Sequence, residues 1–345
     1  MLKNNLIVEN YTLKHHNTFG LDAQCGLFAQ ISSVEGARAV IKRYNPLKLP
    51  IHILGSGSNI LFSKDFYGAL IIKNYIRKIE IIKRDAETVW VLVGGGVLWH
   101  DLVLWTLNRG LSGLENLSLI PGTVGAAPIQ NIGAYGVELA DLLLNVEALH
   151  LETLDIHHFT KNDCAFGYRE SVFKSKLKGQ YLITKVMLQL SRNREVNIEY
   201  GDIRNTLANM NIDSNHITPT DVSNAVCNIR KAKLPDPAMI GNAGSFFKNP
   251  VILNQKWESL QNDFPEMPHY AVGTFEAKIP AAWLIEQCGW KGKRVGNTGC
   301  HARQPLVIVN YGGATGLEIM THAENVQRSV RDKFGIELMR EVNIW

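Results

Sequence analysis

Three residues in separate parts of the chain have side chains that could do chemistry on a ligand. Arg169 lies in Phe166–Ser171; its planar, permanently charged guanidinium would match a carboxylate, although a solvated turn arginine is the simpler local interpretation. Ser245 follows a glycine and precedes two phenylalanines, so it is either an ordinary turn serine or a neutral hydroxyl that donates a proton to a carbanion or enolate. Glu341 lies in a predicted C-terminal strand over 336–345, where carboxylates usually face water.

Two glycine-rich segments could position such chemistry, and we call 54–61 the first glycine wall and 119–136 the second. The second wall has four glycines, two prolines and almost no charge, which fits neither a polar linker nor a core helix. Glycines let main-chain N–H groups approach a ligand and form anion-binding nests. The two walls therefore predict a large phosphate-bearing cofactor. Its expected contacts are Leu54, Gly55, Ser56, Gly57, Ser58, Asn59, Ile120, Pro121, Gly122, Thr123, Gly125, Ala126, Gln130, Asn131, Gly133, Ala134, Tyr135 and Gly136.

Two common nucleotide-binding motifs are absent from the sequence. The first wall has Ile60 where the dinucleotide fingerprint needs its third glycine, and no acidic residue follows about 20 positions later. The chain also has no phosphate-binding loop of the type G-x-x-x-x-G-K-[ST]. A third glycine cluster, Gly94–Gly96, follows a predicted strand over 89–93 and is interpreted as a flexible strand end. The cofactor would thus be held by a different kind of fold.

Composition limits the class of protein. A chain of 345 residues is too long to pack around a single hydrophobic core, so two or three domains are expected. The net charge of +4 is too small and dispersed to indicate nucleic acid binding. No apolar run reaches the roughly 18 residues of a membrane helix, and the first ten residues have no leader pattern. Five scattered cysteines predict reduced thiols, and eleven histidines without ligand spacing predict no metal.

Capping signals and charge predict where several elements begin and end. A capping box formed by Ser32 and Glu35 predicts the start of a helix. The basic, proline-containing run 228–237 is the predicted main domain boundary. A second capping box, Thr315 to Glu318, predicts a long amphipathic helix that ends at Gly335.

Long motifs in a fixed order resemble the type I members of the UDP-N-acetylenolpyruvoylglucosamine reductase (MurB) family, over essentially the whole chain. The family is part of the vanillyl-alcohol-oxidase, or PCMH-type, FAD-binding superfamily. The motifs are Asn17–Gly20, the two glycine walls, Phe166–Ser171, Lys233–Pro237, Gly241–Pro250, Gln287–Gly292 and Arg303–Val307.

The resemblance implies an α+β fold that needs no dinucleotide fingerprint. A two-subdomain FAD-binding module would comprise residues 1–75 and 76–232, the latter with a loop around Tyr200. A substrate-binding domain would comprise 233–345, and the extreme C-terminus would return to the active site.

The resemblance also implies a function. The chain would be a cytoplasmic, NADPH-dependent flavoenzyme with non-covalent FAD, which reduces UDP-N-acetylglucosamine enolpyruvate to UDP-N-acetylmuramate in peptidoglycan precursor synthesis. We expect a monomer that binds neither nucleic acid nor membrane. Arg169, Ser245 and Glu341 match the family's catalytic arginine, proton-donating serine and C-terminal glutamate. The matching substrate contacts are Tyr168, Tyr200, Lys233, Asn249 and Gln304.

The sequence departs from the family near its end, and two other functions stay open. Asn343 replaces a common arginine, which removes any substrate contact made by that arginine, and Arg340 replaces a proline. One alternative is an FAD-dependent sugar or alcohol oxidase of the same fold, in which the substrate rather than NADPH would reduce the flavin. The other is a flavin or nucleotide-sugar sensor without turnover, which the presence of all three matching catalytic residues disfavours.

Overall fold

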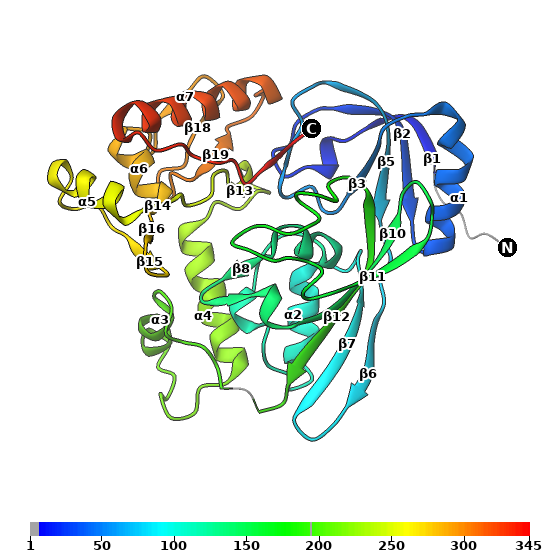
Figure 1. The fold of residues 1–345 in the computed structure, drawn as a ribbon, viewed down its shortest axis with the longest axis horizontal. Helices are drawn as coiled ribbons and strands as arrows, with labels where there is room; N and C mark the ends of the chain where they lie inside the picture. The colour runs from blue at the N-terminus through cyan, green and yellow to red at the C-terminus, as the bar shows by residue number, and fades with distance from the viewer. Residues whose placement is uncertain (1–6, 194) are drawn as a thin grey trace. The chain divides into compact units, whose positions relative to one another are not determined.

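The computed structural model describes residues 7–193 and 195–345, whose elements are drawn in Figure 1. The chain divides into two compact units. Unit 1 comprises Met1–Tyr11, Gln24–Ser56 and Phe66–Ala232, and unit 2 comprises Thr12–Ala23, Gly57–Asp65 and Lys233–Trp345. Both units contain helices and strands, so the predicted α+β class is confirmed. The segments 12–23 and 57–65 cluster with unit 2, and the division into three domains stays a prediction.

The first sheet of unit 1 carries the start of the first glycine wall. Its strand order is β1-β2-β5-β3, with bounds Ile7–Thr12, Gln24–Ile31, Phe66–Asn74 and Ile51–Leu54. β2 and β3 are parallel to β5, and the helix α1 (Val34–Tyr44) connects β2 to β3 and packs on the sheet (Figure 1). The predicted cap Ser32 is wrong by one residue: Ser33 has the extended backbone of an N-cap and accepts a hydrogen bond from Gly36 N at 3.0 Å.

The second sheet of unit 1 is antiparallel, and residues of the second glycine wall pack in its hydrophobic core. Its strand order is β11-β10-β12-β7-β6, with bounds Ile156–Thr160, Leu143–His150, Tyr181–Ser191, Thr88–Gly94 and Ile79–Arg84. Val89, Val91 and Val93 alternate inward along β7 and are fully buried, as a half-buried strand requires. The helix α2 (Trp99–Leu107) and the 3-10 helix η4 (Val124–Gln130) pack in the same core.

The interpretation of Gly94–Gly96 as a flexible strand end is wrong. All three glycines are buried, and a Cβ atom at Gly94 or Gly95 would overlap the carbonyl oxygen of Ile76 or Ile183. Gly95 O accepts a hydrogen bond from Gly125 N at 2.8 Å. The cluster is therefore a close-packed support for the second glycine wall.

Two further α-helices of unit 1 follow β12 along the chain. The helices α3 (Ile203–Asn209) and α4 (Pro219–Lys233) share a small core around Ile203, Val222 and Val226. Tyr135 of the second glycine wall packs against this core. The helix α4 enters the predicted boundary 228–237 and ends where unit 2 resumes.

Unit 2 contains two sheets of three or four strands and three α-helices, besides the two-stranded pair of β4 (Ile60–Leu61) and β20 (Asn343–Ile344). One sheet has the order β13-β19-β18-β17 (Gly241–Ser245, Val307–Asn310, Thr298–Cys300, Arg294–Val295), and the other has β14-β16-β15 (Val251–Leu253, Glu276–Lys278, Tyr270–Val272). The helices are α5 (Asn254–Asp263), α6 (Ala281–Gln287) and α7 (Gly316–Phe334). The capping box of Thr315 and Glu318 and the left-handed Gly335 are confirmed as the two ends of α7. Among the described residues, no helix is both long and apolar enough to cross a membrane.

The C-terminal segment forms less strand than predicted. Of 336–345, only β20 (Asn343–Ile344) is a strand, and it pairs in parallel with β4 (Ile60–Leu61). β4 itself is only two residues long, so its partner cannot extend further. This pairing joins the chain end to the second half of the first glycine wall.

Candidate functional site

The start of the first glycine wall lies directly against the second wall within unit 1. A Cβ atom at Gly55 would lie 2.8 Å from Thr123 Oγ1 and 3.6 Å from Ala126 Cβ. Any larger residue at position 55 would therefore push the two walls apart. The remaining part of the second wall is η4 followed by a hairpin of β8 (Gly133–Ala134) and β9 (Val137–Glu138). Where the two walls meet, the first wall thus contributes bare backbone at Gly55 and the second contributes the small side chains of Thr123 and Ala126, which fits the phosphates of a nucleotide cofactor.

Lys73 is a buried cation beside this cradle that the sequence analysis missed. It lies on β5 with 8% of its surface exposed, and its Nζ donates a hydrogen bond to Gly55 O. Burial, and secondarily the charge of Arg77, lower the pKa of Lys73 to about 8. The signal in the sequence was a lysine inside an apolar strand, between Ile72 and Asn74. A buried ammonium group needs a strong acceptor, and a cofactor phosphate would be one.

Arg169 is held against the hairpin of the second wall. Its backbone is left-handed, with φ of 53°, in a turn closed by the Gly167–Glu170 bridge. Its Nη1 donates to Asn131 O at 3.4 Å, its Nη2 donates to Gly133 O, and its side chain is 19% exposed. The guanidinium carbon lies 5.3 Å from the centre of the Tyr168 ring. The structure therefore brings two predicted site residues, Tyr168 and Arg169, to the second wall.

A second arginine, Arg230 of α4, adds positive charge near Arg169. Burial lowers the pKa of Arg230, and the charge of Arg169 contributes to that shift. Its Nε atom is buried with no hydrogen-bond partner among the described residues. In the sequence, Arg230 is recognisable only as part of the basic run 228–237 that predicts a domain boundary. Two neighbouring guanidinium groups favour an anionic ligand on this side of the second wall.

The loop that carries Tyr200 packs on the far end of the second wall. Asn116 Nδ2 donates to Tyr135 O at 3.0 Å and to Asn197 O at 2.8 Å, which ties the wall to the loop. A Cβ atom at Gly136 would lie 3.4 Å from Tyr200 Cβ. Tyr200 itself is 49% exposed. Its ring can therefore reach a ligand without disturbing the wall.

Ser245 and Glu341 lie on neighbouring backbone segments within unit 2. Glu341 N donates to Phe246 O at 2.8 Å, and Phe247 forms an antiparallel bridge with Arg340. Both Ser245 and Glu341 are half-buried. The C-terminal segment thus runs beside the strand end that carries Ser245, with the backbone of Glu341 paired to Phe246, the residue after the serine.

Asn59 and Asn343 attach that segment to the first glycine wall. Asn59 Nδ2 donates to Glu341 O at 3.3 Å, and Asn59 O accepts from Asn343 N at 3.1 Å and Asn343 Nδ2 at 3.0 Å. Asn343, the departure from the family's arginine, therefore acts here as a structural tether.

The other predicted substrate contacts of unit 2 differ in their surroundings. Gln304 Oε1 is buried with no hydrogen-bond partner among the described residues, so it is an acceptor that a ligand could satisfy. Asn249 Oδ1 already accepts from Ala281 N at 2.9 Å, which caps α6. Lys233 is exposed.

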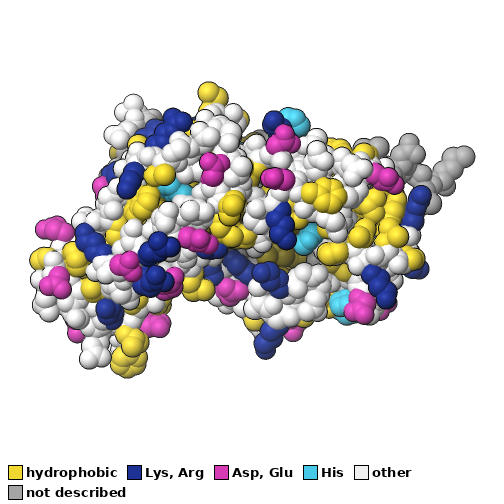
Figure 2. All heavy atoms as spheres, turned by 90° about the horizontal axis from the view of Figure 1, so that it is seen from above, with side chains coloured by type: hydrophobic (Ala, Val, Ile, Leu, Met, Phe, Trp, Pro, Cys, Tyr) yellow, Lys and Arg dark blue, Asp and Glu magenta, His cyan; other side chains and the backbone are white. Residues whose placement is uncertain are grey.

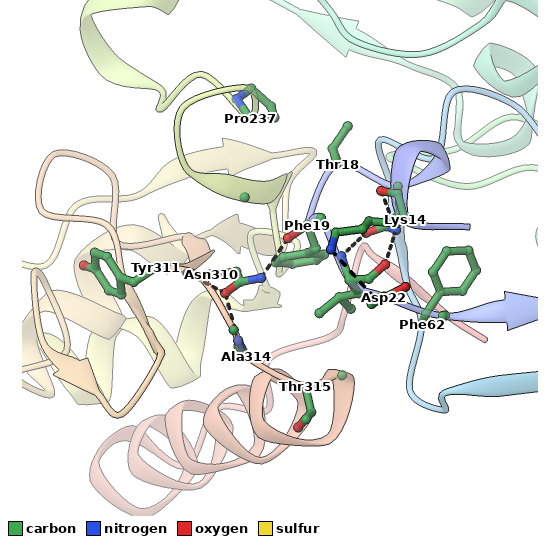
Figure 3. Close-up of a pocket in the computed structure, with 18 of the residues that line it drawn as sticks. Lys14, Thr18, Phe19, Asp22, Phe62, Pro237, Asn310, Tyr311, Ala314 and Thr315 are labelled. Carbon is green, nitrogen blue, oxygen red and sulfur yellow. Dashed lines mark hydrogen bonds and ion pairs between the residues drawn. The ribbon is translucent and has the colours of Figure 1, made fainter. Parts of the chain in front are cut away.

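A cavity of about 1050 Å³ in unit 2 is separate from these residues (Figure 3). It is bordered by the Lys14–Asp22 ion pair, Asn310, Tyr311 and the start of α7, and none of the predicted site residues lines it. Asn310 Nδ2 donates to Phe19 O at 2.9 Å on its wall. The cavity therefore contains none of the groups to which the sequence assigns chemistry.

Comparisons with known proteins bear on the family to which the chain belongs. Residues 236–345 match the family model "UDP-N-acetylenolpyruvoylglucosamine reductase, C-terminal domain", and residues 26–153 match "FAD binding domain". The chain is 48% identical to the UDP-N-acetylenolpyruvoylglucosamine reductase of Flavobacterium johnsoniae over 98% of this chain and 99% of that protein. It is 45% identical to that of Pseudomonas syringae pv. tomato over 97% of both. The crystal structure of MurB from Thermus caldophilus superposes with a TM-score of 0.67 over 99% of both chains, at 24% identity.

Proposed function

Because the chain belongs to the UDP-N-acetylenolpyruvoylglucosamine reductase family, we propose that it reduces UDP-N-acetylglucosamine enolpyruvate to UDP-N-acetylmuramate with NADPH as reductant. It is an FAD-containing oxidoreductase with an FAD-binding domain. The observation that best supports the reaction is the backbone pairing of Glu341 with Phe246, the residue that follows Ser245. The hydroxyl of Ser245 and the carboxylate of Glu341 would supply the groups that proton transfer to a carbon requires.

FAD, held at the glycine walls, would supply the hydride-transfer chemistry between NADPH and the vinyl carbon of the substrate. Arg169 binds the carboxylate of the enolpyruvyl group and stabilises the negative charge that develops beside it. Glu341 helps to polarise the same centre. Ser245 Oγ then donates a proton to the carbon that bears the carboxylate, which gives the lactyl ether.

The glycine walls and Lys73 would hold the cofactor. Gly55 and Thr123 are the residues through which the walls touch, and Lys73 reaches the same point from β5. Tyr168, Tyr200, Lys233, Asn249 and Gln304 would contact the sugar nucleotide. Of these assignments, Gln304 has the strongest support, because its Oε1 is buried with no hydrogen-bond partner in the described part of the chain.

We further propose that the enzyme works as a cytoplasmic monomer. On the face drawn in Figure 2, basic and acidic side chains are intermingled rather than gathered into a basic surface. Together with the net charge of +4, this supports a small-molecule substrate rather than nucleic acid.

An anaerobic absorbance titration of the purified protein tests the function. NADPH is added first and the enolpyruvyl sugar nucleotide second, while the flavin band near ~450 nm is followed. We expect NADPH to bleach the band and the sugar nucleotide to restore it. A band that ignores NADPH but is bleached by a sugar or alcohol would favour the oxidase alternative. A protein that binds no flavin would contradict the assignment of the glycine walls.

A further inference from the structure

The guanidinium of Arg169 is surrounded by a connected set of polar groups that the proposed mechanism does not use. Glu138 Oε1 lies 3.8 Å from Arg169 Nη1, and Glu138 Oε2 accepts a hydrogen bond from Asn131 Nδ2 at 2.7 Å. Asn131 O is in turn an acceptor for Arg169 Nη1. The three side chains therefore form one network on the hairpin of the second wall.

Asn131 joins the two pieces of backbone that determine where the arginine lies. Its Nδ2 also donates to Gly167 O at 3.2 Å, in the turn that carries Arg169, and its Oδ1 accepts from Ala140 N at 3.0 Å. Asn131 has a left-handed backbone with φ of 44° and is 1% exposed. Its side chain is thus engaged inside the protein, and the cofactor contact expected from the sequence for Asn131 stays a prediction.

Gly133 leaves the space in which Glu138 and Arg169 meet. The two residues Gly133 and Glu138 face each other in the β8–β9 pair. A Cβ atom at Gly133 would lie 2.9 Å from Glu138 Cγ and 3.0 Å from Arg169 Nη1. The glutamate and the arginine therefore both pass over the glycine, and a side chain there would displace one of them.

The Glu138–Arg169 pair is poorly suited to stabilising the fold. The Glu138 side chain is 39% exposed and the distance is long, and such pairs contribute little to stability. A catalytic cation, however, must be held within a fraction of an ångström of its productive position. Glu138 also forms a capping box with Asp141 at the start of the 3-10 helix η5 (Leu139–Asp141), so it supports the local backbone, whereas its pairing with Arg169 is best explained by orientation of the arginine.

We propose that Glu138 and Asn131 are positioning residues that fix the Arg169 guanidinium on the carbonyl groups of the second glycine wall before substrate binds. This inference rests on the proposed function, in which Arg169 acts on the substrate carboxylate. It adds two residues to the reaction that act only through the arginine.

The test separates the two half-reactions by rapid mixing of the FAD-loaded protein. We expect Glu138→Ala to slow flavin reoxidation by the enolpyruvyl substrate about 100-fold, the usual cost of a misplaced catalytic group, and to change reduction by NADPH less than about twofold. Glu138→Gln keeps an acceptor for Asn131 and should lose less than about tenfold. Asn131→Gly, which suits the left-handed backbone, should slow reoxidation without loss of FAD. Glu147→Ala is the matched control, because Glu147 pairs with Lys185 at 3.1 Å elsewhere in unit 1.

A double-mutant cycle distinguishes positioning from a structural role. In an Arg169→Ala background, Glu138→Ala should have no further effect on reoxidation, because its effect passes through the arginine. The inference is overturned if Glu138→Ala leaves reoxidation unchanged, slows both half-reactions equally, or has the same effect without Arg169. If instead the wild-type protein is not reoxidised by the enolpyruvyl sugar nucleotide, the proposed function fails, and wild type assayed alongside shows which of the two is wrong.

Discussion

The two units hold their predicted catalytic residues in different ways. In unit 1, Arg169 is held by side chains and carbonyl groups of the hairpin around Asn131 and Glu138. In unit 2, Ser245 and Glu341 are brought together by main-chain hydrogen bonds at Phe246. A side-chain network can be lost by one substitution, whereas a main-chain ladder survives most substitutions. Activity should therefore depend on the neighbours of Arg169 and, in unit 2, mainly on the reacting groups themselves.

The largest effect should come from removing a reacting group in unit 2. Ser245→Ala should slow flavin reoxidation by the substrate by about 10²- to 10⁴-fold, the range that a proton donor contributes, and leave reduction by NADPH nearly intact. Stopped-flow absorbance measures both steps. Ser329→Ala, the same change on α7 where the hydroxyl only bonds Asn325 O, is the control. Equal slowing of both half-reactions would show that Ser245 is not the proton donor.

A buried histidine in unit 2 should lower the free energy of unfolding as the pH falls. His322 accepts or donates hydrogen bonds with Thr298 Oγ1 at 3.1 Å and Cys300 Sγ at 3.5 Å, and burial lowers its pKa to about 4. The unfolded chain takes up this proton near pH 6.5, so the free energy of unfolding should fall by on the order of 3 kcal/mol between pH 6.5 and 4.

Denaturant unfolding of the apoprotein at several pH values tests this contribution. His322→Gln should remove that part of the slope, whereas His216→Gln, at an exposed position, should leave it unchanged. An unchanged slope in His322→Gln would mean that other groups cause the acid sensitivity. Because this cluster lies among core residues, the substitution should alter stability more than the rate of the chemical steps.

In unit 1, the buried ammonium group of Lys73 should lower the stability of the apoprotein and strengthen the binding of FAD. Lys73→Met should raise the Kd for FAD about tenfold, the value of one hydrogen bond to a charged group, as measured by flavin fluorescence. The apoprotein of this variant should be more stable than wild type below pH 8, since the buried charge is removed. That advantage should shrink between pH 8 and 10.5, where the folded Lys73 is neutral but the unfolded one is still charged.

A lysine elsewhere in unit 1 provides the control. Lys185→Met removes an ammonium group that pairs with Glu147 on the second sheet. It should leave the FAD affinity unchanged. If Lys73→Met binds FAD as tightly as wild type does, the lysine serves only to hold Gly55 O.

The sequence predicted elements whose signals are local and missed contacts that depend on the fold. Thr315, Glu318 and Gly335 act within a few residues of the ends of α7, so that helix could be predicted. Gly94–Gly96 could not be interpreted correctly, because the atoms that require glycine belong to Ile76 and Ile183. No local pattern links Lys73 to Gly55, which is 18 positions away along the chain.

The same distinction applies to the candidate site. Arg169, Ser245 and Glu341 were chosen from motifs that resemble a known family. The groups that orient Arg169 were not chosen for that role, since Glu138 looks like an ordinary hairpin carboxylate until the turn at Gly167 is placed against Asn131. Motifs therefore identified candidate reacting groups, and only the folded chain identified what holds them.

The smallest effect should come from the tether of the C-terminal segment. Asn343→Ala removes the side-chain bond to Asn59 O but leaves the bond from Asn343 N to the same oxygen, and the bond from Glu341 N to Phe246 O. Because main-chain bonds still hold Glu341, reoxidation of the flavin should slow less than about threefold, within the range of a surface substitution. Asn131→Gly and Asn343→Ala thus remove comparable side-chain amides from the two units. A larger loss in Asn343→Ala than in Asn131→Gly would show that unit 2, too, depends on a side chain to place its carboxylate.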